Sequence, residues 1–318
     1  MSSLEEGRQF VDSHIIREDD IDWERWESEP ERTKVKPASG FDDSVVDSFL
    51  AEQRIAGALW PWTKANNLGL RYRGGEVSGY CGINGHYKSL LMSQIALTLM
   101  NQGEPCLIAS FEMQPVKTLH RAVRQSLNHS SPSAREIRAW SAWTDGKLWL
   151  YDHLGDVETR RVLAVCRYAA QELGVKHVLI DSLMKCVAES DNRNAEKQFV
   201  SKLVECAKTY GIHIHLVMHA RKKESESDRI GKPDVYGGVD VVNQLDNLYL
   251  IQRNKRNETT EEGVRRLIDP MEPGVWLEVS KQRDGSFEGV ISLWFNVDSL
   301  ALQERPDQSW PKIITERF

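Results

Sequence analysis

The feature that most constrains the fold is an alternation of short apolar runs with longer segments of helical periodicity, which begins at Glu76. Short runs rich in Val, Ile and Leu are typical of buried strands. Strands that alternate with helices form a parallel sheet covered by helices on both faces. The expected strands are Glu76–Cys81, Pro105–Phe111, Leu148–Tyr151, His177–Ile180 and His213–Met218, with helices at 88–101, 114–128, 158–173 and 193–210.

Three further strands are expected after these, at Asn247–Gln252, Val275–Ser280 and Val290–Phe295. No long helical segment separates them, so we expect all three to be antiparallel additions at one edge of the sheet. The predicted fold class is therefore α/β, with a mostly parallel sheet that is flanked by helices and ends in antiparallel edge strands.

The 318 residues divide into an N-terminal arm with a linker helix at 1–56, a main domain at 57–304 and a tail at 305–318. The arm contains 15 acidic and 7 basic residues, so the rest of the chain carries a charge of about +2. Within the arm, Asp42–Ile55 has the pattern of a short helix, which either packs on its own domain or docks on a neighbouring subunit. This balance neither requires nor excludes nucleic acid, because a DNA channel needs only a local basic stripe.

Composition excludes several classes of protein. No run approaches the 18 apolar residues of a membrane-spanning helix, so we expect no membrane partner. The acidic start of the chain lacks the apolar core of a signal peptide. The five cysteines are never closer than 20 residues apart, which excludes a zinc ribbon, and their odd number is typical of reduced thiols in a cytoplasm.

The most informative motif is the segment Gly82-Ile-Asn-Gly-His-Tyr-Lys-Ser89, which lies between an expected strand and an expected helix. A loop in this position points backbone N–H groups and the positive end of the helix at a phosphate chain. Lys88 would reach the β- and γ-phosphates of a nucleotide, and the Ser89 hydroxyl would coordinate Mg²⁺. We therefore expect a site for ATP or another NTP with Mg²⁺, formed by Gly82, Asn84, Gly85, His86, Tyr87, Lys88, Ser89 and Leu90.

Tyr87 departs from the phosphate-loop pattern GxxxxGK[ST], because it stands at the position of the second glycine. Glycine there avoids both a Cβ clash with the phosphates and a restriction on φ. A tyrosine at positive φ carries strain of about 1–3 kcal/mol, which nucleotide binding would have to overcome. We expect a site that works but binds nucleotide weakly, and we expect Tyr87→Gly to lower its apparent Michaelis constant.

Further motifs follow in a fixed order along the chain. The lead-in Gly57–Thr63 with Arg73–Ser78 precedes the phosphate loop, and the later motifs are Ile108–Met113, Val178–Ser182, Leu216–Arg221 and Lys281–Arg283. Together these segments resemble the DnaB-like replicative helicases, which have a RecA-like P-loop NTPase core. The similarity covers about residues 57–300 and is greater to the helicase half of phage primase–helicases and of mitochondrial Twinkle.

The resemblance implies a role for each motif. Glu112 would polarise the attacking water, Asp181 would hold the magnesium ion, and His219 would sense the γ-phosphate. Lys281 and Arg283 would form the KxR element, which crosses the subunit boundary and supplies an arginine finger. Lysine, metal-holding acid, water-orienting carboxylate and arginine finger form a complete set for phosphoryl transfer. Both acids end apolar strands, at the carboxyl edge where open parallel sheets bind ligands.

The resemblance also implies partners. We expect a homo-oligomeric, hexameric ring that translocates on single-stranded DNA during phage-type replication in the host cytoplasm, with primase, loader or polymerase as further partners. Two loops are expected to grip DNA phosphates without reading sequence. The first loop, Lys185–Lys197, carries Arg193. In the second loop, Lys222–Asn243, acidic residues reduce the net positive charge, so the alternative is a charged loop that only faces solvent. The DNA-binding residues expected in the second loop are Lys222, Lys223, Arg229, Lys232, Gly237 and Gly238.

Two other functions stay open. The first is a RecA-like recombination or repair ATPase, although the KxR element and the lead-in favour the helicase branch. The second is a non-catalytic ring or DNA-binding subunit whose phosphate loop is disabled by Tyr87. Because residues 1–56 are too short for a primase domain, the chain is expected to be a stand-alone helicase or the helicase part of a longer protein.

Overall fold

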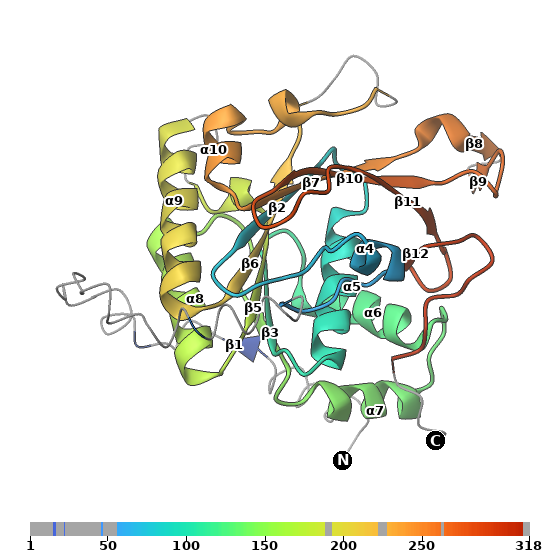
Figure 1. The fold of residues 1–318 in the computed structure, drawn as a ribbon. Coiled ribbons are helices and arrows are strands. Elements are labelled where there is room, and N and C mark those ends of the chain that lie inside the picture. Colours follow the sequence, from blue (N-terminus) through green and yellow to red (C-terminus); the bar gives the residue numbers. More distant parts are fainter. Residues whose placement is uncertain are drawn as a thin grey trace.

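The computed structural model describes residues 56–187, 193–221, 228–261 and 264–313, together with residues 15, 16, 22 and 46. Within these residues a ten-stranded sheet runs through the middle of the molecule (Figure 1). Its parallel strands are β1 (Ile15–Ile16), β2 (Val77–Gly82), β3 (Cys106–Ser110), β4 (Leu148–Tyr151), β5 (His177–Asp181), β6 (His213–His219) and β7 (Asn247–Arg253). Its antiparallel strands are β10 (Val275–Gln282), β11 (Gly289–Phe295) and β12 (Leu302–Gln303).

The strand order is β1-β4-β3-β5-β6-β2-β7-β10-β11-β12, which confirms an α/β fold with antiparallel strands at one edge. The expectation that the last three long strands are all antiparallel was wrong for β7. That strand pairs in parallel with β2, because the short helix α10 (Gly238–Gln244) carries the chain back across the sheet between β6 and β7. The strands after β7 alternate in direction: β10 runs opposite to β7, β11 runs opposite to β10, and β12 runs opposite to β11.

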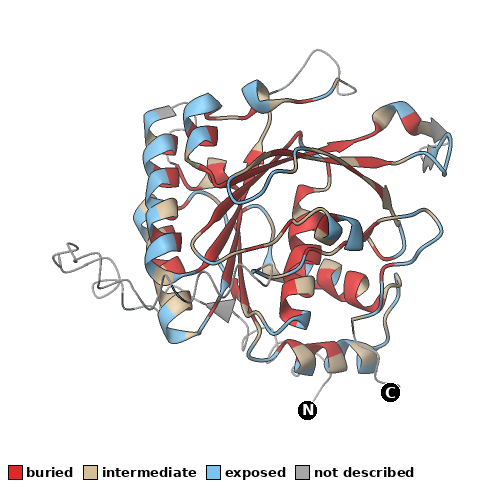
Figure 2. Cartoon of the chain, viewed as in Figure 1, coloured by how far each residue is buried: buried red, intermediate tan, exposed pale blue. Residues whose placement is uncertain are grey.

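Helices cover both faces of the sheet (Figure 1). One face carries α8 (Thr159–Glu172), α9 (Arg193–Tyr210) and α10, and the other carries α4 (Thr63–Asn67), α5 (Lys88–Asn101), α6 (Pro115–Leu127) and α7 (Ala134–Thr144). Figure 2 shows that the buried residues follow the sheet and the inward sides of these helices. The central strands are buried along their whole length, as expected for parallel strands between two helical layers.

The helix α5 is buried on nearly all sides, which explains why its sequence is apolar without a polar stripe. Its one internal amide, on Gln94, is satisfied by the backbone of Leu302: Gln94 Nε2 donates to the Leu302 carbonyl at 2.8 Å, and Gln94 Oε1 accepts the Leu302 N–H at 2.8 Å. The chain segment after β11 therefore closes over α5. Trp310, in the expected tail, is buried against the same layer.

Several elements were not expected from the sequence. The helix α7 begins with a capping box, in which Ser133 and Glu136 bond each other's backbone N–H groups. A small separate hairpin, β8 (Glu258–Glu261) with β9 (Val264–Leu267), projects from the end of β7. The linker helix expected at Asp42–Ile55 lies outside the described residues, apart from Val46. Among the described residues no helix combines the length and the apolar character needed to cross a membrane.

Candidate functional site

The expected phosphate loop, residues 82–89, connects the end of β2 to the start of α5. Gly82 is required by packing, because a Cβ there would come within 2.5 Å of the Ile251 carbonyl oxygen on β7. Gly85 has a φ of +80°, which favours glycine. The buried His86 accepts the N–H of Arg253 at its Nδ1 (3.3 Å), and burial lowers the pKa of His86 to about 4. The neutral ring therefore ties the loop to β7.

Lys88 lies inside the loop and is buried. Its Nζ donates to the carbonyl oxygens of Gly82 (2.7 Å) and Ile83 (3.0 Å). Burial lowers the pKa of the ammonium group, while the nearby Asp181 carboxylate acts in the opposite direction. The only positive charge of the loop is thus held where a phosphate chain bound by the loop N–H groups would pass.

Polar side chains from three neighbouring strands meet beside Lys88. Ser89 Oγ donates to Asp181 Oδ2 at 2.6 Å, and burial raises the pKa of that carboxyl group. Ser182 Oγ donates to Glu112 Oε1 at 2.7 Å, and His219 Nε2 lies 3.5 Å from the same oxygen. Burial lowers the pKa of His219 to about 4, so the imidazole is neutral near pH 7. The strand ends therefore bring an acid pair and a neutral imidazole to one side of the loop.

These side chains line a cavity of about 480 Å³. It contains most of the residues expected from the sequence for nucleotide, metal and catalysis. Three further residues belong to it that the sequence did not single out: Arg121, Arg253 and Leu300. Arg121 lies on an ordinary amphipathic helix and carries no local signal. Arg253 ends β7, which was expected to be antiparallel, so its position at the carboxyl ends of the parallel strands was not foreseen. Its lining residues are Asn84, Gly85, Tyr87, Lys88, Ser89, Leu90, Glu112, Arg121, Asp181, His219, Arg253 and Leu300.

Tyr87 has a φ of 64° and a ψ of 14°, so the left-handed conformation expected for the missing glycine is present. Its ring does not point into the loop. It stacks on Phe295 of β11, with ring centroids 4.3 Å apart and planes at 19°. The guanidinium carbon of Arg253 lies 5.1 Å from the Tyr87 ring centroid, and Arg253 Nη2 donates to Glu258 Oε2 at 2.6 Å.

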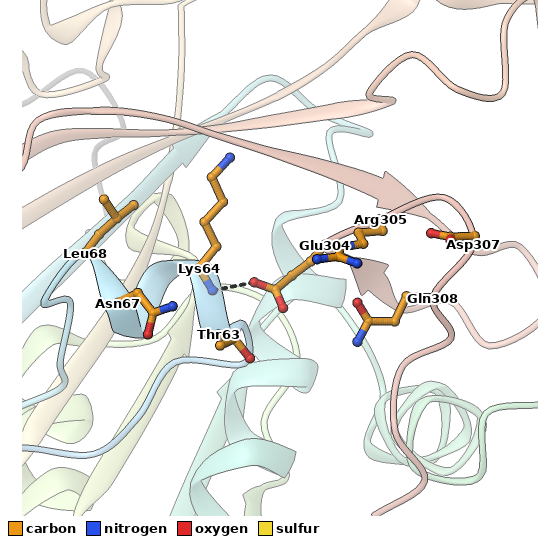
Figure 3. A pocket seen from close by; sticks show the side chains of 8 residues that line it. All are labelled: Thr63, Lys64, Asn67, Leu68, Glu304, Arg305, Asp307 and Gln308. Atoms are coloured by element: carbon orange, nitrogen blue, oxygen red, sulfur yellow. Dashed lines mark hydrogen bonds between the residues drawn. The ribbon is translucent and has the colours of Figure 1, made fainter.

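A larger cavity, of about 730 Å³, lies between α4 and the segment that follows β12 (Figure 3). Its lining is polar, and the Lys64 N–H donates to Glu304 at its mouth, which ties the start of α4 to the C-terminal segment. It contains none of the phosphate-loop residues. The residues that line it are Thr63, Lys64, Asn67, Leu68, Glu304, Arg305, Asp307 and Gln308.

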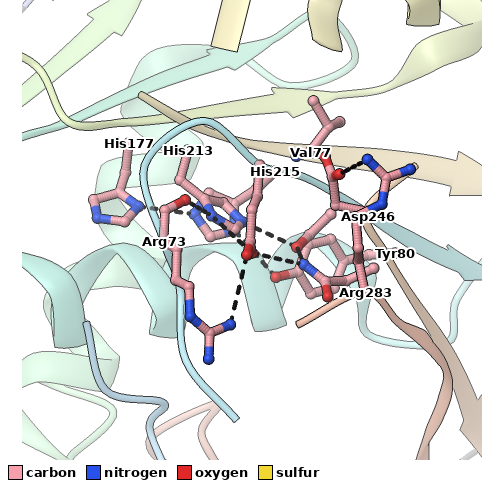
Figure 4. Close-up of polar contacts among 11 residues, drawn as sticks. Arg73, Val77, Tyr80, His177, His213, His215, Asp246 and Arg283 are labelled. Atoms are coloured by element: carbon pink, nitrogen blue, oxygen red, sulfur yellow. Dashed lines mark hydrogen bonds and ion pairs between the residues drawn. The ribbon is translucent and has the colours of Figure 1, made fainter. Parts of the chain in front are cut away.

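Lys281 and Arg283 lie near the amino ends of the parallel strands, whereas the phosphate loop lies at their carboxyl ends. Arg283 Nη1 pairs with Asp246 Oδ1 at 2.7 Å, and Asp246 Oδ2 accepts the N–H of Val77 at the start of β2 (Figure 4). Five strand steps of about 3.3 Å separate that point from Gly82, roughly 17 Å. Lys281 Nζ donates to the last carbonyl groups around α10, with Leu245 O nearest at 2.6 Å.

Beside the Arg283–Asp246 pair, three buried histidines form a polar cluster near the amino ends of β5 and β6 (Figure 4). His215 bonds the Tyr80 hydroxyl at 3.0 Å and His177 at 3.2 Å. His213 Nδ1 donates to the Arg73 carbonyl at 2.7 Å, so its Nε2 accepts from Ser78 Oγ at 2.9 Å. Burial lowers the pKa of His213 to about 4. The cluster joins the lead-in segment to the sheet in a neutral state.

The residues expected to bind DNA are only partly described. Lys222 and Lys223 lie outside the described residues, and Arg193 begins α9. Arg229 packs over Trp276, with its guanidinium carbon 4.9 Å from the ring centroid, and Lys232 Nζ lies 3.8 Å from Glu288 Oε2.

Two glycines at the end of the second loop, Gly237 and Gly238, were expected among the DNA-binding residues, and the structure gives Gly237 a role in the backbone turn. Gly237 is buried at a φ of +85°, where a Cβ would meet Val241 at 2.7 Å. It is therefore required for the close turn that begins α10. Gly238 also has a positive φ, of +73°, but no atom lies within 4 Å of a Cβ placed there.

A phosphate loop between a central parallel strand and a helix, with acids on the neighbouring strand ends, defines a P-loop nucleotide-binding domain. Residues 49–225 match the family model described as "AAA domain", and the chain belongs to that family. The fold is that of the ATPase domain of DnaB-like replicative helicases.

Comparisons with individual proteins also give similarities to helicases. The chain is 24% identical, over 314 residues, to the protein named "DNA helicase/primase" of Enterobacteria phage T3; the match covers 87% of this chain and 55% of that protein. The chain thus corresponds to little more than half of this relative's length. The structure named "ATPase Domain of G40P" superposes with a TM-score of 0.70 at 14% identity, over 83% of this chain and 98% of that one. "The Structure Of A DnaB-Like Replicative Helicase And Its Interactions With Primase" superposes with a TM-score of 0.70 at 13% identity, over 85% and 68%.

The buried histidine cluster is expected to make the free energy of unfolding depend on pH. His213 has a folded pKa of about 4 against an ordinary 6.5, so between these values the unfolded chain binds a proton that the folded chain does not. The contribution of the neutral His213 imidazole to the free energy of unfolding is therefore complete above about pH 6.5 and is lost as the pH falls toward 4. We expect His213→Asn to make the slope of unfolding free energy against pH shallower by about 1.4 kcal/mol per unit between these limits. Urea unfolding at a series of pH values measures it; an unchanged slope contradicts the assignment.

Proposed function

We propose that this chain is the NTP-hydrolysing motor of a ring-forming DNA helicase that moves along single-stranded DNA during phage-type replication. One observation carries the proposal: a single cavity at the carboxyl edge of the sheet gathers Lys88, the Ser89–Asp181 pair, Glu112 and His219. The similarity to the helicase/primase of phage T3 supports the helicase branch of the family. A bacterial host cytoplasm is the proposed location.

The cavity suits a magnesium nucleotide. Ser89 and Asp181 offer hard oxygen ligands 2.6 Å apart, beside the ammonium group of Lys88, and this is the donor set that Mg²⁺ with a phosphate prefers. We propose that these two residues hold Mg²⁺ and that the loop N–H groups with Lys88 hold the phosphates of ATP or another NTP. The bound ion would supply charge compensation for the phosphates.

Glu112 is proposed as the base that orients the attacking water. It is an exposed carboxylate held on one side by Ser182, so an oxygen remains for a water molecule. His219, neutral and 3.5 Å from Glu112, is placed to donate to the terminal phosphate and to report its presence to β6. Such a contact would link the nucleotide to the second loop, which directly follows β6.

Arg283 is proposed as an arginine finger that acts on the nucleotide of a neighbouring subunit. It is half exposed and lies at the opposite end of β2 from its own phosphate loop, beyond the reach of an arginine side chain. Lys281 is proposed to act with it, because its contacts with the end of α10 hold the strand from which Arg283 extends. A ring of identical subunits, with six as the expected number, would bring each Arg283 to a neighbouring site.

Single-stranded DNA is proposed to bind to the loops after β5 and β6, with Arg193, Lys222, Lys223, Arg229 and Lys232 as phosphate contacts and Gly237 and Gly238 shaping the second loop. The loops follow β5 and β6, whose last residues, Asp181 and His219, line the nucleotide cavity. This arrangement supports coupling between hydrolysis and DNA. Primase, loader and polymerase are proposed partners; the structure of a DnaB-like replicative helicase and its interactions with primase has this fold.

Unwinding of a forked duplex in the presence of NTP tests the helicase function directly. A recombination ATPase would instead form filaments and pair strands. A second candidate function, a non-catalytic ring or DNA-binding subunit, is favoured by Tyr87 at its positive φ. Steady-state hydrolysis with and without single-stranded DNA separates it from the helicase, since such a subunit shows no turnover with either.

Glu112→Gln is expected to leave ATP affinity nearly unchanged and to lower kcat by a factor of about 10²–10⁴, because it removes a general base and no phosphate contact. Asp181→Asn is the matched comparison, and it should weaken magnesium-dependent binding and turnover together. Titration of ATP and measurement of phosphate release give both quantities. Parental turnover in Glu112→Gln would exclude this residue as the base.

Mixing Arg283→Ala subunits with Lys88→Ala subunits is expected to restore part of the hydrolysis that each variant lacks, because some interfaces then pair an intact loop with an intact arginine. Phosphate release is measured at several mixing ratios, after co-assembly has been established by differential labelling. Mixtures that assemble but remain as inactive as either parent variant rule out a finger supplied by the neighbour.

Replacing Lys222, Lys223 and Arg229 together by Ala is expected to weaken single-strand binding about equally for any sequence and to flatten its dependence on salt, by about 0.7 in the logarithmic slope for each lost phosphate contact. Basal hydrolysis should persist without stimulation by DNA. Replacing the exposed Lys117, Lys202 and Lys312 changes the net charge equally and serves as the control. A salt slope equal to that of this control would place the DNA contact elsewhere.

A further inference from the structure

The nucleotide cavity has two chemically different ends, and the strand order separates them. Asp181 and His219 end β5 and β6, on one side of the central strand β2. Arg253 ends β7, and Phe295 ends β11, on the other side of β2. A nucleotide whose terminal phosphate faces the acids therefore extends its sugar and base toward Arg253.

At the end of the cavity near Arg253, the Tyr87 ring fills the space beside Phe295 and the Arg253 guanidinium group, which we call the nucleobase slot. One of its contacts is the nearly parallel ring of Phe295, at 4.3 Å, and another is the guanidinium group of Arg253, at 5.1 Å. Arg253 is held by Glu258, and the Phe295 side chain packs on the core, so both groups keep their positions without Tyr87. Proteins commonly stack nucleobases on aromatic rings and on arginine guanidinium groups, and this site offers one of each.

We propose that Tyr87 is an internal plug of the nucleobase slot, so that the base of a bound nucleotide stacks on Phe295 and Arg253 only after the phenol ring has left. This inference rests on the proposed NTP site. The exchange replaces one stacked ring by another, so the base adds little net affinity and the phosphate chain carries most of the binding. The weak binding expected from Tyr87 then has a second cause besides its positive φ, namely competition for the slot.

The two causes are separated by the choice of ligand and of substitution. Magnesium tripolyphosphate uses the phosphate loop but has no base, whereas magnesium ATP uses both parts. Tyr87→Ala removes the ring but keeps a Cβ at a positive φ, so the backbone strain stays. Tyr87→Phe keeps the ring and is the matched control. Calorimetric titration of both ligands into the full chain gives the affinities.

We expect the parent protein to bind ATP and tripolyphosphate with affinities within about threefold of one another, because one stacked ring replaces another. Tyr87→Ala is expected to bind ATP about tenfold more tightly, because the base then stacks on Phe295 and Arg253 without displacing a ring. The same substitution should change tripolyphosphate affinity less than about twofold, since that ligand does not enter the slot. Tyr87→Phe should match the parent with both ligands.

Three results would overturn the inference or its basis. Weaker ATP binding in Tyr87→Ala makes Tyr87 a platform for the base and not a plug. An equal change for both ligands means that residue 87 acts only through the backbone of the loop. If tripolyphosphate affinity is the same in Lys88→Ala as in the parent, or no variant binds either ligand, the proposed nucleotide site itself fails, and the plug fails with it.

Discussion

The parallel pairing of β5, β6 and β2 is the constraint on which the functional site depends. Because these strands run in one direction, their carboxyl ends lie at one edge of the sheet, and the register places Gly82 beside His219 and Ser110 beside Asp181. Residues more than a hundred positions apart in the chain therefore line one cavity. The helices on both faces exclude water from the strands, and this burial raises the pKa of Asp181 and lowers that of His219.

The two edges of the sheet serve different chemistry. The carboxyl edge holds groups that match a phosphate chain, whereas the amino edge holds Arg283 with Asp246 and the neutral histidine cluster. In a single subunit the arginine lies too far from its own phosphate loop to assist there. For the proposed function, the catalytic set of such a subunit would be complete only where the amino edge of one copy meets the carboxyl edge of another.

Tyr87 shows how a departure from a motif is absorbed by its surroundings. The left-handed backbone that glycine usually provides is retained, at a φ of 64°. The cost of that conformation is offset by stacking on Phe295 and by the guanidinium group of Arg253, both from strands on the far side of β2. The same contacts hold the ring in the part of the cavity toward which a base would extend. On the proposal made for Tyr87, they would stabilise the loop and lower its affinity for nucleotide.

The sequence by itself determined the main alternation of strands and helices, because burial on both faces makes parallel strands apolar and because the helices between them are longer segments. The starts and ends of β4, α5 and α9 agree with the predicted ranges. It also indicated the phosphate loop and the strand-end residues Glu112, Asp181 and His219, which the fold brings into one cavity. The cap Ser133–Glu136 was a readable signal for α7 that was missed. Only the tertiary structure decided that β7 is parallel and that Arg121, Arg253 and Leu300 join the cavity. It also decided that Tyr87 stacks on Phe295. These contacts depend on the pairing of strands that are distant in the chain, and no local sequence pattern encodes that pairing.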